Sequence, residues 1–339
     1  MLSRDAQGSR NEVGRHLKIV IPGGSGQVGT VLGRAMHSEG HDVVVLSRQP
    51  SARPWQVVGW DGATLGAWST ELDGSDVVIN LTGRSVNCRY TPKNRQEILE
   101  SRVKATRVLG EAISQAKRPP RVWLQASTAT IYAHRYDAPN DEASGRTGGD
   151  ELDAPSTWKF SIEVARAWER AFIEAVVPHT RKVALRSAMT MSPDPGGIFD
   201  TLLGLVKRGL GGQAGDGRQF VSWIHYEDFV RATLWLIDHE EIEGVVNMAA
   251  PHPLPNADFM RVLREASGIR LGLPATKWML EIGALFMQTE TELILKSRRV
   301  VPGRLLDHGF VFKYPRWPDA ARELCLQWKL AHQRPSNAA

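Results

Sequence analysis

The first half of the chain alternates short apolar runs with longer segments in which apolar residues recur every three or four positions. The strand-sized runs are 17–21, 42–46, 76–81, 122–125 and 182–186. Helical spacing follows Gly29, extends over 92–116, and appears again after residue 157. Continuous apolar strands alternating with amphipathic helices are typical of a parallel sheet covered on both faces. The pattern therefore predicts an α/β protein with a Rossmann-type, doubly wound parallel sheet.

Beyond Met191 this alternation weakens. Helical stretches near 199–209, 227–238, 256–267 and 277–297 are joined by short extended pieces and by segments rich in proline and glycine. One apolar run, 245–248, has the character of another sheet strand. We expect a smaller, mostly helical C-terminal lobe that covers the carboxyl ends of the strands, with the chain returning to the sheet once.

These patterns divide the chain into four parts. They are a flexible N-terminal segment, 1–15; a Rossmann domain, 16–191, which also receives 215–250; a substrate-side C-terminal lobe, 192–328; and a loose tail, 329–339. Within the first domain, 55–70 is rich in tryptophan and irregular, and 139–157 is rich in Gly, Pro, Asp and Ser. Structureless connections as long as 139–157 are uncommon in compact domains, so this segment is a candidate lid.

Composition and charge exclude several classes of protein. Of 339 residues, 42% are hydrophobic and 23% are charged, which is ordinary for a globular protein. No apolar run approaches the roughly 20 residues of a membrane span, and residues 1–15 show no secretory signal. The net charge of +5 comes from dispersed basic residues mixed with acids, which argues against a nucleic-acid partner. Cys88 and Cys325 have no disulfide-framework spacing. We therefore expect a cytoplasmic protein without membrane contact.

A glycine-rich segment after the first predicted strand is the clearest site signal. Gly23, Gly26 and Gly29 form a G-x-x-G-x-x-G pattern. The first glycine permits a tight turn, the second lets a pyrophosphate approach the backbone, and the third lets the helix pack closely on the strand. Unpaired N–H groups at the start of the helix, around Gln27 and Val28, can then bind phosphates. The alternative is a glycine-rich turn needed only for packing.

The end of the second predicted strand indicates which dinucleotide binds. Ser47 and Arg48 stand where an acidic residue would bind the ribose 2′-hydroxyl of NAD, whereas a hydroxyl and a guanidinium can hold a 2′-phosphate. We therefore predict NADP(H) in preference to NAD(H); the alternative is that Arg48 is a surface arginine. Asp61 could accept a hydrogen bond from the adenine amine, or could stabilise its own turn. Three residues should pass beside the adenosine ribose: Leu81, Thr82 and Gly83.

Taken together, these segments resemble the extended and atypical short-chain dehydrogenase/reductases, and within them the epimerase family, which is NAD-dependent epimerase/dehydratase-like. The matching segments are 19–26, 80–83, 90–93, 98–103, 168–169, 215–219, 222–228, 247–251, 299–306 and 309–312. The last two resemble that group's C-terminal domain of unknown function, which would span 277–325. The resemblance covers residues 17–325 and implies a Rossmann fold, bound NADP(H) and a substrate cleft under the C-terminal lobe.

The resemblance also implies active-site positions, and here the chain departs from the family. Thr128 falls where extended members place an active-site serine or threonine. Such enzymes make a proton donor from a Tyr-x-x-x-Lys pair on one helix face. No tyrosine of this chain is followed four residues later by a lysine. The best register puts Ser161 and Ala165 at those positions, with Trp158/Ile162 and Phe160/Val164 as neighbouring choices.

Further departures surround these positions. Ser101 stands where an asparagine would complete the proton relay, Pro22 replaces a threonine, and Arg84 replaces an acidic residue. Tyr132 is a candidate proton donor, but its alternative is a packed residue beneath the cofactor site. Other residues considered as substitutes for the missing acid are His134, Tyr136, Cys88 and Glu163.

The remaining candidates lie between the last strands and the lobe. Arg186 should anchor the loop near the nicotinamide, with Ser187 and Met189 beside the ring. Arg218 and Gln219 could bind an anionic or sugar substrate, or could belong to a turn. Three more residues are predicted to be structural: Trp223 and His225 joining the lobes, and Asp228 capping the following helix.

We therefore predict an NADP(H)-binding, epimerase-like protein that acts on a small polar substrate, such as a sugar-like or carbonyl metabolite. The alternative is a non-catalytic NADP(H) sensor or scaffold that binds a protein partner. Assembly as a homodimer is left open. The ten histidines are scattered, with no His-Glu-x-x-His, so we expect no metal site.

Overall fold

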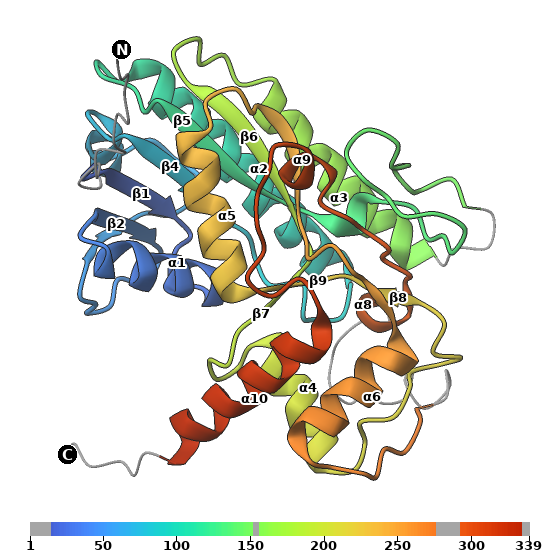
Figure 1. Ribbon diagram of the computed structural model, residues 1–339. Helices are drawn as coiled ribbons and strands as arrows, with labels where there is room; N and C mark the ends of the chain where they lie inside the picture. The colour runs from blue at the N-terminus through green and yellow to red at the C-terminus, as the bar shows by residue number, and fades with distance from the viewer. Residues whose placement is uncertain (1–14, 152–155, 276–291, 334–339) are drawn as a thin grey trace, which may run out of the picture.

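The computed structural model describes residues 15–151, 156–275 and 292–333, and its centre is a parallel sheet (Figure 1). The described residues form seven strands in the order β10-β6-β5-β4-β1-β2-β3. All six neighbouring pairs are parallel. The strands are β1 (Lys18–Pro22), β2 (Asp42–Ser47), β3 (Gln56–Gly59), β4 (Val77–Asn80), β5 (Val122–Thr128), β6 (Arg181–Ser187) and β10 (Gly244–Met248). The predicted fold class is confirmed.

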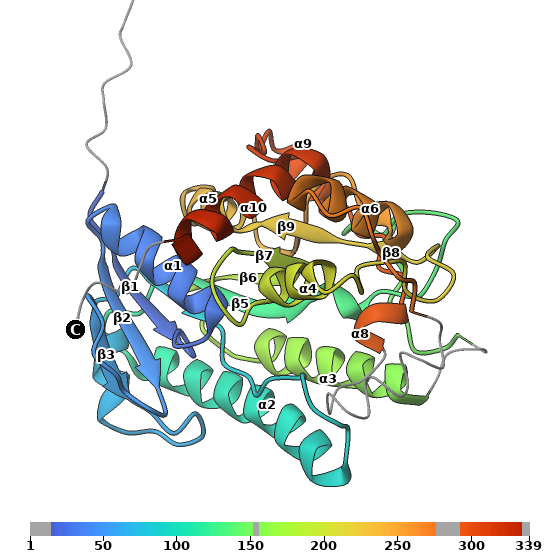
Figure 2. The same cartoon turned by 90° about the horizontal axis from the view of Figure 1, so that it is seen from below.

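Helices cover both faces of this sheet (Figure 2). One face carries α1 (Gln27–Ser38) and α5 (Tyr226–Asp238), and the other carries α2 (Pro92–Gln115) and α3 (Ser156–Ile173). Alternate residues of a strand point to opposite faces, so Ile19 joins the core under α1 and α5 while Val20 joins the core under α2. Local sequence fixes the start of α2, since Pro92 is its first residue and the Thr91 hydroxyl accepts the Asn94 N–H at 3.2 Å.

The C-terminal lobe begins just beyond the end of β6 and is mostly helical, as predicted (Figure 1). Phe259 and Trp317 stack in its core with ring centroids 4.1 Å apart, and Trp223 lies 5.0 Å from Trp317. Its helices are α4 (Ile198–Lys207), α6 (Asn256–Ser267), α8 (Glu292–Leu295), α9 (Gly303–Asp307) and α10 (Trp317–Gln333). Its short strands are β7 (Met189–Met191), β8 (Phe220–Val221), β9 (Trp223–His225) and β11 (Leu254–Pro255). Among the described helices, none combines the length and apolarity needed to cross a bilayer.

Two sequence predictions about secondary structure were wrong. Segment 55–70 is not irregular: it contains edge strand β3 and a 3₁₀ helix, η1 (Ala67–Leu72). Trp60 and Trp68, with ring centroids 4.9 Å apart, pack this excursion onto the sheet. Residues 329–333 are not a loose tail, because they continue α10. Trp328 anchors this end of the helix by donating to Asp200 at 2.7 Å and stacking under the Lys207 ammonium. Residues 1–14, 276–291 and 334–339 of the predicted N-terminal segment, C-terminal domain and tail lie outside the described residues.

The candidate lid, 139–157, is tied to the C-terminal segment over its first part. Asn140 donates its N–H to the Arg299 carbonyl at 2.6 Å and accepts the Val301 N–H at 3.0 Å. The Glu142 carboxylate accepts the N–H of Asn247, at the end of β10, at 2.7 Å. This part of the segment is therefore a fixed connection, residues 156–157 begin α3, and 152–155 lie outside the described residues.

Candidate functional site

A cavity of about 240 Å³ lies where the carboxyl ends of β1, β2, β3 and β4 meet. The strand order reverses between β1 and β4, which is where open α/β sheets bind ligands. We call this cavity the crevice. Its lining residues are Gly23, Ser25, Gly26, Leu46, Ser47, Arg48, Trp60, Asp61, Gly62, Leu81, Thr82, Gly83, Arg84 and Ser101.

The glycines at the crevice are each required by a different feature of the local geometry. Gly23 has φ +74°, and a Cβ there would lie 2.7 Å from the Thr82 Cα. A Cβ on Gly29 would lie 2.4 Å from the Gly24 Cα, so the helix could not pack so closely. At Gly26 a Cβ would find nothing nearer than 4.0 Å, which leaves space for a ligand beside the backbone. The sequence pattern did not single out Gly24, although a Cβ added there would lie 2.9 Å from side-chain atoms of Ile21 and Val45.

Polar groups in and beside the crevice fit a phosphorylated dinucleotide. Gly26 caps α1 without a side-chain hydrogen bond, so the amides of Gln27 and Val28 in the first turn have no helical partner. Thr82 Oγ1, Trp60 Nε1 and Gln27 Nε2 are buried and have no hydrogen-bond partner among the described residues. Buried polar atoms are normally satisfied, so these three indicate a site that receives a polar ligand.

The end of the crevice beside β2 and β3 contains the residues predicted to select the cofactor. Arg48 is exposed and makes no hydrogen bond or ion pair within the described chain, so its guanidinium can bind an anion. Ser47 is buried, and its hydroxyl bonds the backbone of Gln49 at 3.2 Å. The Asp61 carboxylate accepts the Ala63 and Thr64 N–H groups and the Thr64 hydroxyl. These bonds, the Thr64 hydroxyl first, lower the pKa of Asp61. Asp61 thus stabilises its turn, and its adenine contact stays a prediction.

A second cavity, of about 120 Å³, contains Thr128 at the end of β5. We call it the Thr128 cavity. Ser161 of α3 lines it, in the predicted register, whereas Ala165 is fully buried against the end of β5. The other lining residues are Val86, Tyr90, Ile98, Arg102, Thr130, Phe160, Val164 and Trp168. Thr128, Ser161 and the phenol of Tyr90 therefore come together, which places a tyrosine at the site that the sequence did not predict.

A chain of hydroxyl groups leads from the Thr128 cavity to the C-terminal lobe. Tyr90 Oη lies 3.4 Å from Ser161 Oγ, which donates to Glu292 Oε2 at 2.5 Å. Lys296 donates to the Thr130 carbonyl at 2.8 Å and lies 3.9 Å from Glu292 Oε1. Burial first, and then the charge of Arg298, lower the pKa of Lys296 to about 8. No sequence spacing joins these residues, because 131 positions separate Ser161 from Glu292.

A separate buried network fixes the ends of β5, β6 and β10. Glu169 of α3 forms two hydrogen bonds of 2.8 Å with Arg186 and accepts the Ser127 hydroxyl at 2.5 Å. Arg186 stacks over the Tyr132 ring at 5.0 Å. Arg186 therefore joins β6 to α3. Its role in anchoring the loop near the nicotinamide stays a prediction. Tyr132 donates to Asn247 at 2.9 Å, and burial raises its pKa. Tyr132 is thus packed in this network, and it does not line the Thr128 cavity.

Several predicted positions lie away from the Thr128 cavity. Ser101 faces the crevice instead, and its hydroxyl accepts the Arg84 N–H at 3.0 Å. Arg84 pairs with Glu97 at 3.0 Å. Exposed Arg218 lies over Tyr136, and buried Gln219 donates to the Ala214 carbonyl at 2.9 Å. Neither residue lines either cavity, so the geometry favours their interpretation as a turn.

The other residues considered as proton donors do not lie in the Thr128 cavity. His134 accepts the Ser297 N–H at 2.8 Å, and burial lowers its pKa. Glu163 is exposed on α3. Cys88 and Cys325 are both free cysteines. Ser187 ends β6 and Met189 begins β7, and their contact with a nicotinamide ring stays a prediction.

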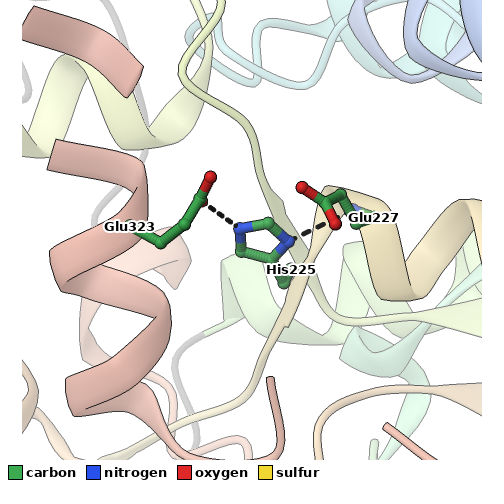
Figure 3. Close-up of side chains that lie close together, drawn as sticks. All are labelled: His225, Glu227 and Glu323. Carbon is green, nitrogen blue, oxygen red and sulfur yellow. Dashed lines mark hydrogen bonds and ion pairs between the residues drawn. The ribbon is translucent and has the colours of Figure 1, made fainter. Parts of the chain in front are cut away.

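His225, Glu227 and Glu323 lie together where β9 meets α10 (Figure 3). Their ligand atoms lie within 4.8 Å of one another. The ring nitrogens already have partners, since Nδ1 accepts the Glu227 N–H at 3.2 Å and Nε2 lies 2.8 Å from Glu323 Oε2. His225 therefore joins β9 to α10, and Trp223 contacts Trp317 beside it, so both residues pack within the C-terminal lobe. Their role in joining the two lobes stays a prediction.

The predicted cap of α5 was wrong. His225, not Asp228, occupies the N-cap position of this helix. The fully buried Asp228 carboxylate instead accepts the N–H groups of Lys313 and Tyr314, each at 2.7 Å. This carboxylate fixes the segment that leads into α10.

Comparison with known proteins agrees with this architecture. The sequence profile of the NAD dependent epimerase/dehydratase family matches residues 19–249, and 275–324 match a domain of unknown function, DUF1731. Epimerase family protein SDR39U1 of Homo sapiens is 29% identical over 313 residues, or 91% of this chain and 99% of that protein. Epimerase family protein SSP1921 of Staphylococcus saprophyticus is 31% identical over 306 residues, or 90% and 98% of the two chains. The crystal structure of human SDR39U1 (isoform 2) with NADPH has a TM-score of 0.80 at 28% identity and covers 91% of this chain and 99% of its own.

Proposed function

The chain belongs to the NAD dependent epimerase/dehydratase family, and from this premise we propose that it binds NADP(H) and acts as an oxidoreductase or epimerase on a small polar metabolite. The observation that carries the proposal is the crevice at the β1–β4 switch point, with its glycine turn and with buried atoms of Thr82 and Trp60 that have no hydrogen-bond partner in the part of the chain that the structure describes. A relative of similar fold was crystallised with NADPH, which supports the choice of ligand.

The residues of the crevice would bind successive parts of the cofactor. The open backbone at Gly26 and the first amides of α1 suit the pyrophosphate. Arg48 would bind the 2′-phosphate, because a guanidinium forms strong, paired hydrogen bonds with phosphate oxygens. Bound in this way, NADP(H) would supply or accept a hydride at the nicotinamide ring.

The Thr128 cavity would hold the reacting group of the substrate. The Thr128 hydroxyl would orient a carbonyl or hydroxyl oxygen, as its counterpart does in related enzymes. Tyr90, which shares this cavity, can give a proton to that oxygen or take one from it. Ser161 and Glu292 would then carry the proton between the phenol and the lobe, since the contacts of 3.4 and 2.5 Å form a continuous path.

Fluorescence titration with NADPH and NADH tests the cofactor. We expect NADPH to bind at least tenfold more tightly than NADH, because charge-assisted hydrogen bonds contribute about 1.5–3 kcal/mol. Arg48→Ala should remove this preference, while Arg53→Ala, at an exposed arginine outside the crevice, should keep it. Equal binding of the two cofactors to the unmodified protein would contradict the NADP(H) assignment.

Activity is tested separately with NADPH and a panel of small carbonyl compounds. Oxidation of NADPH in the presence of one or more of them is the expected result. If NADPH binds tightly and none is reduced, the second candidate function gains support: a non-catalytic NADP(H) sensor or scaffold. The lack of a Tyr-x-x-x-Lys pair favours this candidate. A sensor should bind a protein partner with different affinity in its NADPH and NADP⁺ forms, which a pull-down with each nucleotide measures.

A further inference from the structure

The cationic side chain in the wall of the Thr128 cavity is Arg102, which lies in the first half of α2. We propose that Arg102 binds a carboxylate group of the substrate, so that the substrate is a small carboxylic acid with a nearby carbonyl or hydroxyl group. The inference deepens the proposed function and rests on it for the reaction, but the binding of the acid is measurable by itself.

The surroundings of Arg102 hold the guanidinium in one place and leave donors available. Nη1 donates to the carbonyls of Arg84 at 3.0 Å and Ile98 at 2.9 Å. The guanidinium lies 5.0 Å from the centre of the Trp168 ring. A Cβ on Gly83 would lie 3.0 Å from its Cζ, so glycine provides the room for it. Nε and Nη2 make no hydrogen bond within the described chain, and these two nitrogens form the edge that binds a carboxylate in a bidentate pair.

No carboxylate of the described residues lies within ion-pair distance of Arg102. The neighbouring Arg84 pairs with Glu97 at 3.0 Å, and Arg186 pairs with Glu169 at 2.8 Å. Burial lowers the pKa of Arg102 to about 10, and the attraction of Tyr90 offsets only part of this effect. A desolvated cation without a counter-ion is costly, and a ligand carboxylate in the cavity would relieve that cost.

The shape of the cavity limits the rest of the substrate. About 120 Å³ is well below the roughly 300–1,000 Å³ of typical drug-sized ligand sites, so a nucleotide-linked sugar would not fit within the described walls. Val86, Ile98, Phe160 and Val164 make much of the wall apolar. Thr128, Tyr90 and Ser161, which each carry a hydroxyl group, line the same space. The site therefore suits a short apolar acid whose second oxygen-bearing group contacts Thr128.

Calorimetry with isobutyrate and its neutral isostere isobutyramide tests this inference on the full chain saturated with NADP⁺. Isobutyrate should bind at least tenfold more tightly than the amide. Arg102→Gln should lower the affinity for isobutyrate at least tenfold, while the affinity for NADPH changes less than about threefold. Arg107→Gln, at an exposed arginine of the same helix, should change neither.

Three results would overturn the proposal. They are no binding of isobutyrate to the unmodified protein, equal isobutyrate affinity of the Arg102→Gln variant and the unmodified protein, or a tenfold loss of NADPH affinity in the variant. The last result would assign Arg102 to a phosphate of the cofactor instead. If the Arg102→Gln variant does not fold, crystals of the unmodified protein soaked in isobutyrate test the proposal instead. The proposal requires the carboxylate of isobutyrate to contact Arg102 in such crystals. If NADPH itself does not bind, the cofactor assignment fails, and the isobutyrate titration without nucleotide still tests Arg102.

Discussion

At the scale of single residues, the glycines of the first turn separate folding from ligand binding. A Cβ on Gly29 would lie 2.4 Å from the Gly24 backbone, whereas one on Gly26 would face open space. Gly29→Ala should therefore lower the free energy of unfolding by about 1–3 kcal/mol, the usual range for overpacking. Gly26→Ala should leave thermal unfolding unchanged and lower the affinity for NADPH at least tenfold, because the added methyl group would occupy the space of the pyrophosphate. Thermal denaturation and fluorescence titration of both variants check this pair.

Tyr90 gives a second prediction at this scale. Removing a general acid or base typically slows turnover about 10²–10⁴-fold. Tyr90→Phe should therefore lower kcat by that range on any substrate found, with NADPH affinity retained, since Tyr90 does not line the crevice. Tyr136→Phe, at a half-exposed tyrosine outside the cavity, serves as the control. An unchanged kcat in Tyr90→Phe would exclude the phenol as proton donor.

Part of the candidate site could be predicted from the sequence. Gly23, Gly26 and Gly29 follow one another in a spacing set by a single turn, and Thr128 and Ser161 follow from the family's register. Tyr90 and Arg102 could not be recognised, because a tertiary contact joins them to residues far away in sequence. For Arg218 and Gln219 the sequence left two interpretations open, because a polar turn and a ligand-binding turn have the same composition.

At the scale of elements, Glu169 joins α3 to the central strands. Its carboxylate accepts two bonds from Arg186 and one from Ser127 in a buried environment. Glu169→Gln should lower the free energy of unfolding by about 3–5 kcal/mol, because it leaves the guanidinium of Arg186 buried without a counter-ion. Glu163→Gln, on the exposed side of the same helix, should change it by less than about 0.5 kcal/mol. Urea denaturation of the two variants measures the difference.

The same scale explains which elements the sequence predicted. Strands β1, β2 and β4 are buried on both faces and therefore read as continuous apolar runs. Strand β3 lies at the edge, and its four residues are only half-buried or exposed, so it has no such signal. The last residues of α10 were missed because their stability comes from the tertiary contacts of Trp328 with Asp200 and Lys207.

At the scale of the whole molecule, Lys296 joins the C-terminal segment to the loop after β5, and this contact makes stability depend on pH. Its folded-state pKa of about 8 lies below the ordinary value of 10.5, so the unfolded chain binds the proton more tightly. The free energy of unfolding should therefore rise between about pH 8 and pH 10 as the buried ammonium is neutralised.

Lys296→Met isolates this effect from the other titrating groups. The difference in free energy of unfolding, unmodified protein minus variant, should increase by on the order of 1–3 kcal/mol from pH 7.5 to pH 10, the range that the pKa difference allows. The groups that act on Lys296 are Arg298, Glu292 and Glu151. Denaturation of both proteins across this range provides the measurement, and a constant difference would show that Lys296 titrates normally.

The position of strand β10 in the sequence limits where the chain can be truncated. The strand pairs with β6 but is synthesised only after the first part of the lobe, β7 to β9, so the sheet closes on that side with residues 244–248. A truncation after Met191 would leave β6 as a bare edge strand whose backbone groups could recruit strands of other molecules. Such a fragment should aggregate rather than fold, and on the ribosome the nucleotide-binding half cannot reach its final form until the polypeptide has passed through the first part of the lobe and returned to the sheet.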